Sequence, residues 1–320
     1  MSGCYKILLG EVKYVRGRIV KGVGNFFDVY IEEDCELKDK IIACNSKGIF
    51  RKDNIKPLVG DMVDIELNFG NKDETIGIIN TIAERKNFLF RPPIANLDIL
   101  FIVAAVKSPD PAYYFIDKLT VTAVDNDITP VIIINKIDLL DNSELYDIYK
   151  KAGFKTFKIS AETMTPDRRE LSEIKEEMRG RICAFSGVSG VGKSSVLNKI
   201  FPELKLDTGS LSNKIERGKH TTRVVELFKN GLDGYVADTP GFSMIDFENY
   251  VNISKDNLIL DFPDLNQYAT GCRYKKCAHI KEEGCEVLHA VEENKVAKER
   301  HESYTVLYDA LKKQKNKDWK

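Results

Sequence analysis

The segment GVSGVGKS at Gly187–Ser194 constrains this chain more than any other part of its sequence. A short apolar run at 182–185 precedes it, and a helix is expected at 195–200. In such a strand–loop–helix unit the glycines let the backbone curve around a phosphate, and N–H groups at the helix start supply positive potential. The Lys193 ammonium is expected to bind the β- and γ-phosphates and the Ser194 hydroxyl to bind Mg²⁺. The predicted phosphate-binding residues are Gly187, Val188, Ser189, Gly190, Val191, Gly192, Lys193, Ser194 and Ser195.

Apolar strands alternate with helices on both sides of this loop. We expect strands at 98–106, 129–135, 154–160 and 181–187, followed in turn by helices at 111–126, 142–152, 167–178 and 192–201. Two more strands are expected at 222–230 and 234–240. Continuously apolar strands joined by helices are typical of a parallel sheet covered on both faces. The sequence therefore predicts a doubly wound α/β domain at 89–245.

The segment 1–88 has a different pattern. Short runs of alternating branched and aromatic residues stand between Gly and Asn/Asp breaks, which predicts an antiparallel barrel of about five strands resembling an OB fold. The segment FRPPIANLD follows, and Pro92 and Pro93 mark a hinge-like boundary. A structural barrel and an RNA-binding barrel are both compatible with this pattern. The net charge of −1 over 320 residues means that binding to nucleic acid would require a local patch.

Two polar segments follow strands in the central domain and have a specific chemical interpretation. Asn135-Lys136-Ile137-Asp138 closes one strand, and Ser160-Ala161 closes the next. The Asp138 carboxylate can accept hydrogen bonds from N1–H and the exocyclic amino group of guanine, whereas adenine offers no matching donors. The Lys136 stem can cover the ring, Asn135 can tie neighbouring loops together, and the Ser160-Ala161 backbone can bind the guanine O6. The sequence therefore predicts a guanine nucleotide.

A second phosphate-side motif, Asp238-Thr-Pro-Gly241, follows the strand GYVA. A carboxylate at a strand end beside a phosphate loop can hold Mg²⁺ through water, and the Gly241 N–H can donate to a γ-phosphate. The order of the motifs is unusual, because the base-reading segments at 135 and 160 precede the phosphate loop at 187. In ordinary small GTPases the phosphate loop comes first. The same sheet can form from a circularly permuted chain.

This order, together with GKHTT at 218–222, resembles the RsgA (YjeQ/EngC) family of circularly permuted bacterial GTPases, and the resemblance covers essentially the whole chain. It implies hydrolysis of GTP to GDP that is stimulated by the small ribosomal subunit, in late maturation of that subunit. It also implies contact with ribosomal RNA, and we expect a monomeric cytoplasmic protein. Two alternatives can be tested against it: an ATP-using P-loop enzyme, and an RNA-binding scaffold whose nucleotide site is inactive.

GTP hydrolysis requires a positioned water molecule, and Phe242 stands where Ras-like proteins carry a water-orienting Gln. His220 in the GKHTT loop is the candidate catalytic residue, because a neutral imidazole can position water or accept its proton. The alternative is that His220 packs the loop or touches RNA. Either Thr221 or Thr222 is expected to complete the Mg²⁺ shell.

The chain has seven cysteines, and three of them cluster with a histidine near the C-terminus. Cys272, Cys277, His279 and Cys285 give the spacing C-x₄-C-x-H-x₅-C, a donor set typical of a closed structural Zn²⁺ site. A disulfide, an iron–sulfur cluster and coincidence are the alternatives. The other cysteines (Cys4, Cys35, Cys44 and Cys183) are scattered and are expected to be buried or half-buried.

The segment 246–320 is therefore predicted to be a zinc-binding helical module. Two helices are expected after Cys285, with lysines concentrated near the end, where a solvated tail and an RNA contact are both possible. We expect neither His289 nor His301 to be a ligand. No apolar run approaches the length of a membrane span, and no signal peptide is recognised, so no membrane partner is expected.

Overall fold

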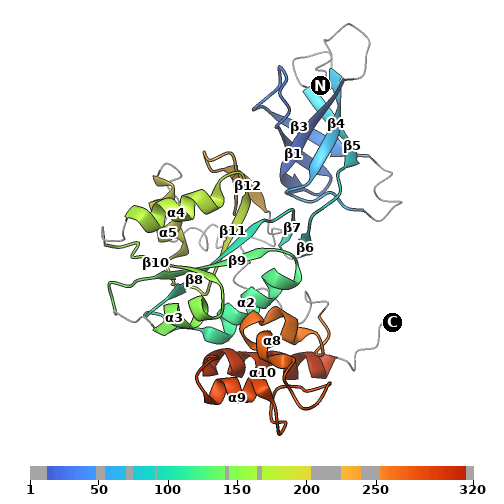
Figure 1. The fold of residues 1–320 in the computed structure, drawn as a ribbon. Coiled ribbons are helices and arrows are strands. Elements are labelled where there is room, and N and C mark those ends of the chain that lie inside the picture. Colours follow the sequence, from blue (N-terminus) through green and yellow to red (C-terminus); the bar gives the residue numbers. More distant parts are fainter. Residues whose placement is uncertain are drawn as a thin grey trace, which may run out of the picture.

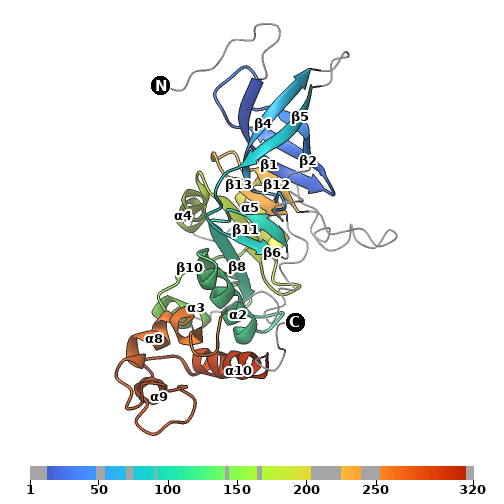
Figure 2. The same cartoon turned by 90° about the vertical axis from the view of Figure 1, so that its right-hand side faces the viewer.

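The computed structural model describes residues 13–47, 55–69, 75–90, 92–140, 144–163, 168–202, 225–238 and 253–314. In both views the N-terminal strands lie at one end of the molecule, the sheet that contains β8 (Ile99–Ala105) to β13 (Tyr235–Asp238) in the middle and the C-terminal helices at the other end (Figures 1 and 2). No helix in these ranges is both long and apolar enough to cross a membrane.

The N-terminal strands close into a five-stranded barrel, as predicted. They are β1 (Lys13–Val23), β2 (Phe26–Ile31), β3 (Ile41–Ser46), β4 (Met62–Phe69) and β5 (Thr75–Ile82). Their order is β1-β2-β3-β5-β4, and β1 also pairs with β4, which closes the barrel. Strand β1 takes part in both pairings at Gly17, where a Cβ atom would lie 2.5 Å from the Tyr30 carbonyl oxygen. The glycine therefore allows one strand to curve between two partners.

A short hairpin occupies the segment where the sequence suggested a hinge. Strands β6 (Phe88–Phe90) and β7 (Pro93–Ala95) pair antiparallel and form a separate two-stranded sheet. Proline is tolerated here because Pro93 is the first residue of an edge strand. The domain limits at 88 and 245 stay predictions.

The central sheet has the predicted doubly wound architecture. Five strands run parallel: β8 (Ile99–Ala105), β9 (Thr129–Asn135), β10 (Lys155–Lys158), β11 (Ile182–Ser186) and β13 (Tyr235–Asp238). Strand β12 (Glu226–Lys229) is antiparallel to β13, and the order is β10-β9-β8-β11-β13-β12. The helices that connect these strands are α2 (Tyr113–Asp125), α3 (Glu144–Lys151), α4 (Arg168–Met178) and α5 (Lys193–Ile200).

Alternate residues of β8 belong to two different cores, which explains its uninterrupted apolar sequence. Leu100 and Ile102 pack in the core that contains α2 and α3 residues, whereas Phe101 and Val103 pack in the core that contains α4 and α5 residues. All seven residues of β8 are buried. A strand that has no solvent-facing side shows no polar alternation.

The C-terminal segment forms a third core against α2. It contains the 3₁₀ helix η3 (Leu258–Asp261) and the helices α8 (Pro263–Ala269), α9 (Glu286–Glu292) and α10 (Lys298–Gln314). Helices α9 and α10 are the two predicted after Cys285. Helix α8 was not predicted, although proline at its first position is a recognised start signal. Val121 of α2 lies in the same apolar cluster as Phe262 and Leu307.

A fully buried ion network fixes this module to the central domain. Arg300 of α10 donates to Asp264 of α8 at 2.8 and 3.0 Å, and to Asp117 of α2 at 2.6 Å. The Tyr149 hydroxyl of α3 donates to the same Asp117 oxygen at 2.9 Å. The Arg300 and Asp117 side chains are completely inaccessible to solvent. Four helices therefore meet at one guanidinium group.

Candidate nucleotide and metal sites

The predicted phosphate loop connects the carboxyl end of β11 to the first turn of α5. Its neighbours in the sheet are β8 and β13, which run parallel to β11. The carboxyl ends of parallel strands form the edge at which open α/β sheets bind ligands. The loop therefore lies at the expected edge.

Three glycines give the loop its curvature. Gly187, Gly190 and Gly192 have φ values of +151°, +83° and +91°, a range that L side chains rarely adopt. Gly187 and Gly192 are also in close contact with other segments: a Cβ atom would lie 2.2 Å from the Val103 carbonyl oxygen and 2.4 Å from Asn135 Nδ2, respectively. Gly192 caps α5 in the left-handed conformation, so the helix N–H groups begin directly after the turn.

Lys193 keeps its ammonium group inside this loop. Its Nζ atom donates to the Gly187 and Val188 carbonyl oxygens at 2.8 and 3.0 Å. Burial lowers the pKa of Lys193, because a cation loses hydration when it leaves water. An added phosphate would restore favourable interactions for this charge, so the loop is suited to an anion.

Asn135 connects the loops of the base-reading and phosphate-binding segments. Its Nδ2 group donates to the Val191 carbonyl oxygen at 2.8 Å, and its Oδ1 atom accepts from the Ala161 N–H at 3.0 Å. The side chain is almost completely buried. These two bonds join the end of β9 to the loop after β11 and to the segment after β10, which is the tying role suggested by the sequence.

The rest of the predicted base site lies beside Asn135. Asp138 is exposed, and the buried Ser160 hydroxyl donates to its Oδ1 atom. Ser160 Oγ also accepts from the Thr163 N–H at 3.0 Å, which fixes the hydroxyl. Lys136 has φ +63° and its ammonium donates to the Ser108 carbonyl oxygen. The sequence analysis did not identify Ser108, because a backbone acceptor has no residue-type signal.

Several predicted residues lie outside the described residues. They are His220, Thr221, Thr222 and Gly241. Asp238 is the last residue of β13, which runs parallel to β11. Only its backbone belongs to the described part of the chain.

The four predicted metal ligands meet in one cluster. The ligand atoms of Cys272, Cys277, His279 and Cys285 all lie within 4.8 Å of one another. Cys272 Sγ and Cys285 Sγ are 3.8 Å apart, and they lie 3.4 and 3.5 Å from His279 Nδ1. A tetrahedral Zn²⁺ ion with Zn–S bonds of about 2.3 Å and a Zn–N bond of about 2.0 Å requires separations of about 3.8 and 3.5 Å. The three separations among Cys272, His279 and Cys285 therefore fit a tetrahedral ion of this size, and Cys277 Sγ lies within 4.8 Å of these ligand atoms.

The backbone around these ligands is held by neighbouring side chains. Glu282 accepts N–H bonds from Ala278, Ile280 and Lys281 at 3.0 to 3.1 Å. Burial raises its pKa, but these N–H bonds outweigh burial and lower the pKa to about 2. His301 Nε2 lies 2.7 Å from the His279 carbonyl oxygen, so it supports a ligand's backbone.

The scattered cysteines have the environments predicted for them where they are described. Cys44 and Cys183 are buried, and Cys35 is half-buried. Burial raises the pKa of Cys44 to about 12, so its thiol is unreactive near neutral pH. Cys4 lies outside the described residues.

Comparison with known proteins identifies the family. The family model described as RsgA GTPase matches residues 82–248, and that of the RsgA N-terminal domain matches residues 16–79. The chain belongs to the RsgA GTPase family. It is therefore a GTP hydrolase, and the resemblance seen in its motif order is confirmed. Membership of a GTPase family disagrees with the alternative prediction of an ATP-using P-loop enzyme.

Curated relatives and solved structures match nearly the whole chain. The small ribosomal subunit biogenesis GTPase RsgA of Ruminiclostridium cellulolyticum is 41% identical over 298 residues, covering 92% of this chain and 93% of that protein. The protein of the same name from Geobacillus kaustophilus is 38% identical and covers 93% and 98%. The crystal structure of YloQ, a circularly permuted GTPase, has a TM-score of 0.74 at 32% identity, covering 98% of this chain and 100% of that one. YjeQ from Thermotoga maritima has a TM-score of 0.75 at 33% identity, covering 93% and 99%.

A third family model illustrates the permutation. The model described as 50S ribosome-binding GTPase matches residues 182–317, so its match begins at β11 and omits the base-reading segments after β9 and β10. In the RsgA family chain those segments come first. A parallel sheet can keep the same strand neighbours wherever the chain starts.

Proposed function

We propose that this GTPase acts in late maturation of the small ribosomal subunit and that docking on the 30S subunit stimulates its GTP hydrolysis. The observation that carries the proposal is the name small ribosomal subunit biogenesis GTPase, shared by relatives 37–41% identical over nearly the full chain. We further propose that it contacts ribosomal RNA, acts as a monomer and is cytoplasmic.

Nucleotide binding is proposed to divide between two sets of residues. Asp138, together with Lys136 and the Ser160-Ala161 backbone, selects guanine. The loop Gly187–Ser195 and Lys193 bind the phosphates through N–H groups and one ammonium. The bonds from Asn135 to Val191 and Ala161 support this division, because they hold both sets in one fixed arrangement.

Catalysis is proposed to depend on His220. Since Phe242 cannot orient water, an imidazole in the GKHTT loop is the residue suited to position the attacking water or accept its proton. Ser194 and either Thr221 or Thr222 would hold Mg²⁺, with Asp238 acting through water. A Mg²⁺ ion held by these residues would supply positive charge that stabilises the charge developing on the phosphates.

The metal cluster is proposed to hold one structural Zn²⁺ ion. Three thiolates and an imidazole fill a tetrahedral shell, which leaves no position for a substrate. The sulfur and nitrogen separations fit Zn²⁺ and support it over a disulfide, because three cysteines and a histidine converge on one point.

The decisive experiment is single-turnover GTP hydrolysis with and without purified 30S subunits. Completion of an active site by a partner is worth about 10³–10⁵-fold in Ras-type enzymes, and we expect a smaller gain if docking only orders a loop. His220→Ala should abolish most of the stimulated turnover while GTP affinity and 30S binding stay near normal.

His289→Ala is the matched control, because His289 is exposed on α9 and contacts only Glu286, at 3.8 Å, among the ion pairs of the described residues. Wild-type protein that hydrolyses GTP equally with and without 30S subunits would contradict the proposed function. Stimulated hydrolysis that survives in His220→Ala would exclude the catalytic role, and lost 30S binding would assign His220 to the RNA interface.

A further inference from the structure

The barrel contacts the central sheet at the strand pair β12–β13. Lys21 of β1 pairs with Glu226 of β12, and Lys21 Nζ lies 2.9 Å from Glu226 Oε2. In the β12–β13 register, Glu226 lies directly opposite Asp238. The barrel is therefore bonded to Glu226, and Glu226 is the cross-strand neighbour of Asp238, the last residue of β13.

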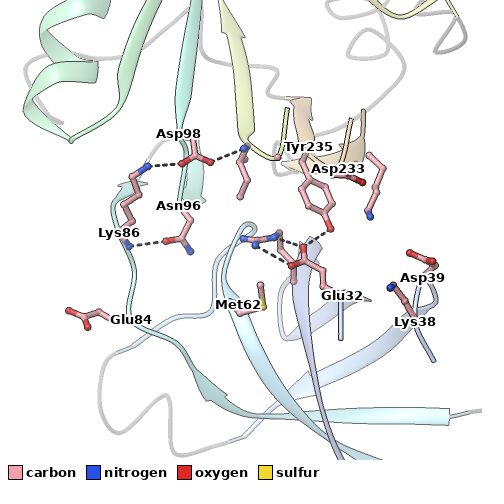
Figure 3. A pocket seen from close by; sticks show the side chains of 14 residues that line it. Glu32, Lys38, Asp39, Met62, Glu84, Lys86, Asn96, Asp98, Asp233 and Tyr235 are labelled. Atoms are coloured by element: carbon pink, nitrogen blue, oxygen red, sulfur yellow. Dashed lines mark hydrogen bonds and ion pairs between the residues drawn. The ribbon is translucent and has the colours of Figure 1, made fainter. Parts of the chain in front are cut away.

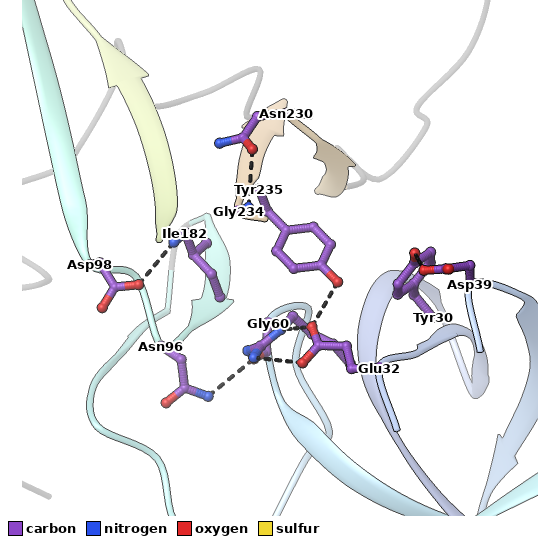
Figure 4. A network of polar contacts seen from close by, with 11 residues as sticks. Tyr30, Glu32, Asp39, Gly60, Asn96, Asp98, Ile182, Asn230, Gly234 and Tyr235 are labelled. Carbon is purple, nitrogen blue, oxygen red and sulfur yellow. Dashed lines mark hydrogen bonds and ion pairs between the residues drawn. The ribbon is translucent and has the colours of Figure 1, made fainter. Parts of the chain in front are cut away.

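The other end of β13 is also held by the barrel. Tyr235, the first residue of β13, is buried, and its hydroxyl donates to Glu32 Oε1 at 2.7 Å (Figure 4). Arg18 of β1 donates to both Glu32 oxygens, at 2.8 and 3.4 Å. We call Arg18, Glu32 and Tyr235 the barrel latch. Arg18 on β1 and Glu32, directly after β2, supply the charged groups of the latch, and Tyr235 on β13 supplies the phenol.

Aromatic and cationic groups support the latch. The Tyr30 ring lies edge-on to the Tyr235 ring at 6.2 Å, and Lys229 Nζ lies 4.4 Å from the Tyr30 centroid. Burial, and then the bond to Glu32, raise the pKa of Tyr235. Burial also acts to raise the pKa of Glu32, but the bonds from Arg18 prevail and lower it. The latch is therefore a neutral phenol donating to an ionised carboxylate, which is a strong class of hydrogen bond.

A cavity of about 510 Å³ borders the latch and reaches the linker between barrel and sheet (Figure 3). On its far side Lys86 lies 2.6 Å from Asp98, and Asn96 Nδ2 donates to the Gly60 carbonyl oxygen at 3.1 Å. Polar contacts thus surround the cavity, beside a buried apolar cluster that contains residues of both the barrel and the central domain. The polar contacts are directional, so they fix the orientation of the groups that they join.

We propose that Tyr235 and Glu32 are positioning residues through which the barrel sets the position of Asp238, at the Mg²⁺ side of the nucleotide site. The inference rests on the proposed role of Asp238. The barrel holds β13 at Tyr235 and, through Glu226, at the level of Asp238, and the strand between them has only four residues. Because coupling between two sites is reciprocal, a partner that shifts the barrel changes Mg²⁺-dependent GTP binding, and Mg²⁺–GTP changes how the barrel is held.

Two conservative variants open the latch without removing its packing. Tyr235→Phe deletes the donated hydroxyl, and Glu32→Gln removes the carboxylate charge. Asp64→Asn is the matched control, because Asp64 is also a barrel carboxylate held by an arginine, with Arg16 at 2.8 and 3.3 Å. Its contacts to Arg16 and Thr81 lie within the barrel.

The test titrates Mg²⁺ into full-length protein with a fluorescent non-hydrolysable GTP analogue and reads analogue binding. Both latch variants should need about three- to tenfold more Mg²⁺ for half-maximal binding of the analogue. This change corresponds to a fraction of the free energy that one charge-assisted hydrogen bond contributes. Their GDP affinity in EDTA should equal that of the wild type. The control should match the wild type throughout.

Wild-type Mg²⁺ dependence in both latch variants would overturn the inference. So would an equal loss of affinity with and without Mg²⁺, because that result indicates general damage to the site. These readouts need no ribosome. Failure of 30S subunits to stimulate the wild type would contradict the proposed function. The Mg²⁺ titration would still show whether Tyr235 and Glu32 influence Mg²⁺-dependent nucleotide binding.

Discussion

At the scale of single residues, we propose that the choice of nucleotide base depends on Asp138. Ser160 donates to its Oδ1 atom, and Ser160 is itself fixed by the Thr163 N–H. The carboxylate oxygen Oδ1 therefore has a protein donor, and the exposed carboxylate keeps further lone pairs that could accept from the two donors of guanine. We therefore expect the buried serine to contribute to base recognition, because it bonds to the exposed Asp138 side chain.

Asp138→Asn should weaken GTP binding and favour xanthosine triphosphate. Ser160 will donate to the amide oxygen, which turns the amide NH₂ toward the base. That NH₂ faces a donor in guanine but an acceptor, the C2 oxygen, in xanthine. The preference for GTP over XTP should change by at least about tenfold, as expected when a hydrogen-bonding group of the bound base is left without its partner. Competition of GTP and XTP for a fluorescent nucleotide measures it.

Asp147→Asn on the exposed face of α3 serves as the control, since it makes the same chemical change away from the strand ends. An Asp138→Asn protein that still preferred GTP over XTP would show that another residue reads the base.

At the scale of elements, the metal loop has little apolar core of its own. Its ligands come from a segment of fourteen residues between α8 and α9, where Arg273, Tyr274, Lys275 and Lys276 are exposed. Such a segment can be ordered by metal binding, whose free energy then becomes folding free energy. The loop rests on α10 through Tyr304, whose hydroxyl donates to the Ala278 carbonyl oxygen at 3.1 Å.

Cys277→Ala should release the metal, because a tetrahedral structural site needs all four ligands. Elemental analysis should find one Zn²⁺ per wild-type chain and less than a stoichiometric amount in the variant. GTP binding should change less than about threefold, since the ligands lie outside the central sheet. Cys35→Ala, which removes a half-buried thiol of the barrel, should keep the metal. Iron and labile sulfide in the wild type would refute the zinc assignment.

At the scale of the whole molecule, Arg300 joins the C-terminal module to the central domain. It connects α8 and α10 with α2, and Tyr149 adds α3 to the same network. The start of α3 follows the base-reading segment, and α2 follows the loop whose Ser108 carbonyl accepts from Lys136. The module is therefore anchored on helices next to the predicted base-reading segments.

Arg300→Met should destabilise the protein by about 3–5 kcal/mol, because it leaves two carboxylates buried without their cation. During urea unfolding, the C-terminal module of the variant should detach at a lower urea concentration than in the wild type. Limited proteolysis or hydrogen exchange of the module measures this release. Arg179→Met removes the exposed Arg179–Glu176 pair, whose side chains are 52% and 61% accessible, and should cost less than about 1 kcal/mol. Equal effects of the two substitutions would mean that the buried network does not dock the module.

Much of the architecture and of the candidate site can be predicted from the sequence because it depends on neighbours along the chain. The phosphate loop is one continuous strand–loop–helix unit, and its glycines have the backbone angles that the motif requires. The four metal ligands lie within fourteen residues, so their spacing already restricts the donor set. The order of base and phosphate motifs likewise indicates the permuted family without any coordinates.

The long-range polar pairs were decided only by the tertiary structure. Arg300 meets Asp117 across 183 positions, and Tyr235 meets Glu32 across 203. With 48 basic and 49 acidic side chains in the chain, composition permits very many such pairs. A carboxylate acts as an ordinary solvated group until the fold removes water from it and brings one donor within bonding distance, and both conditions arise only when distant segments pack together.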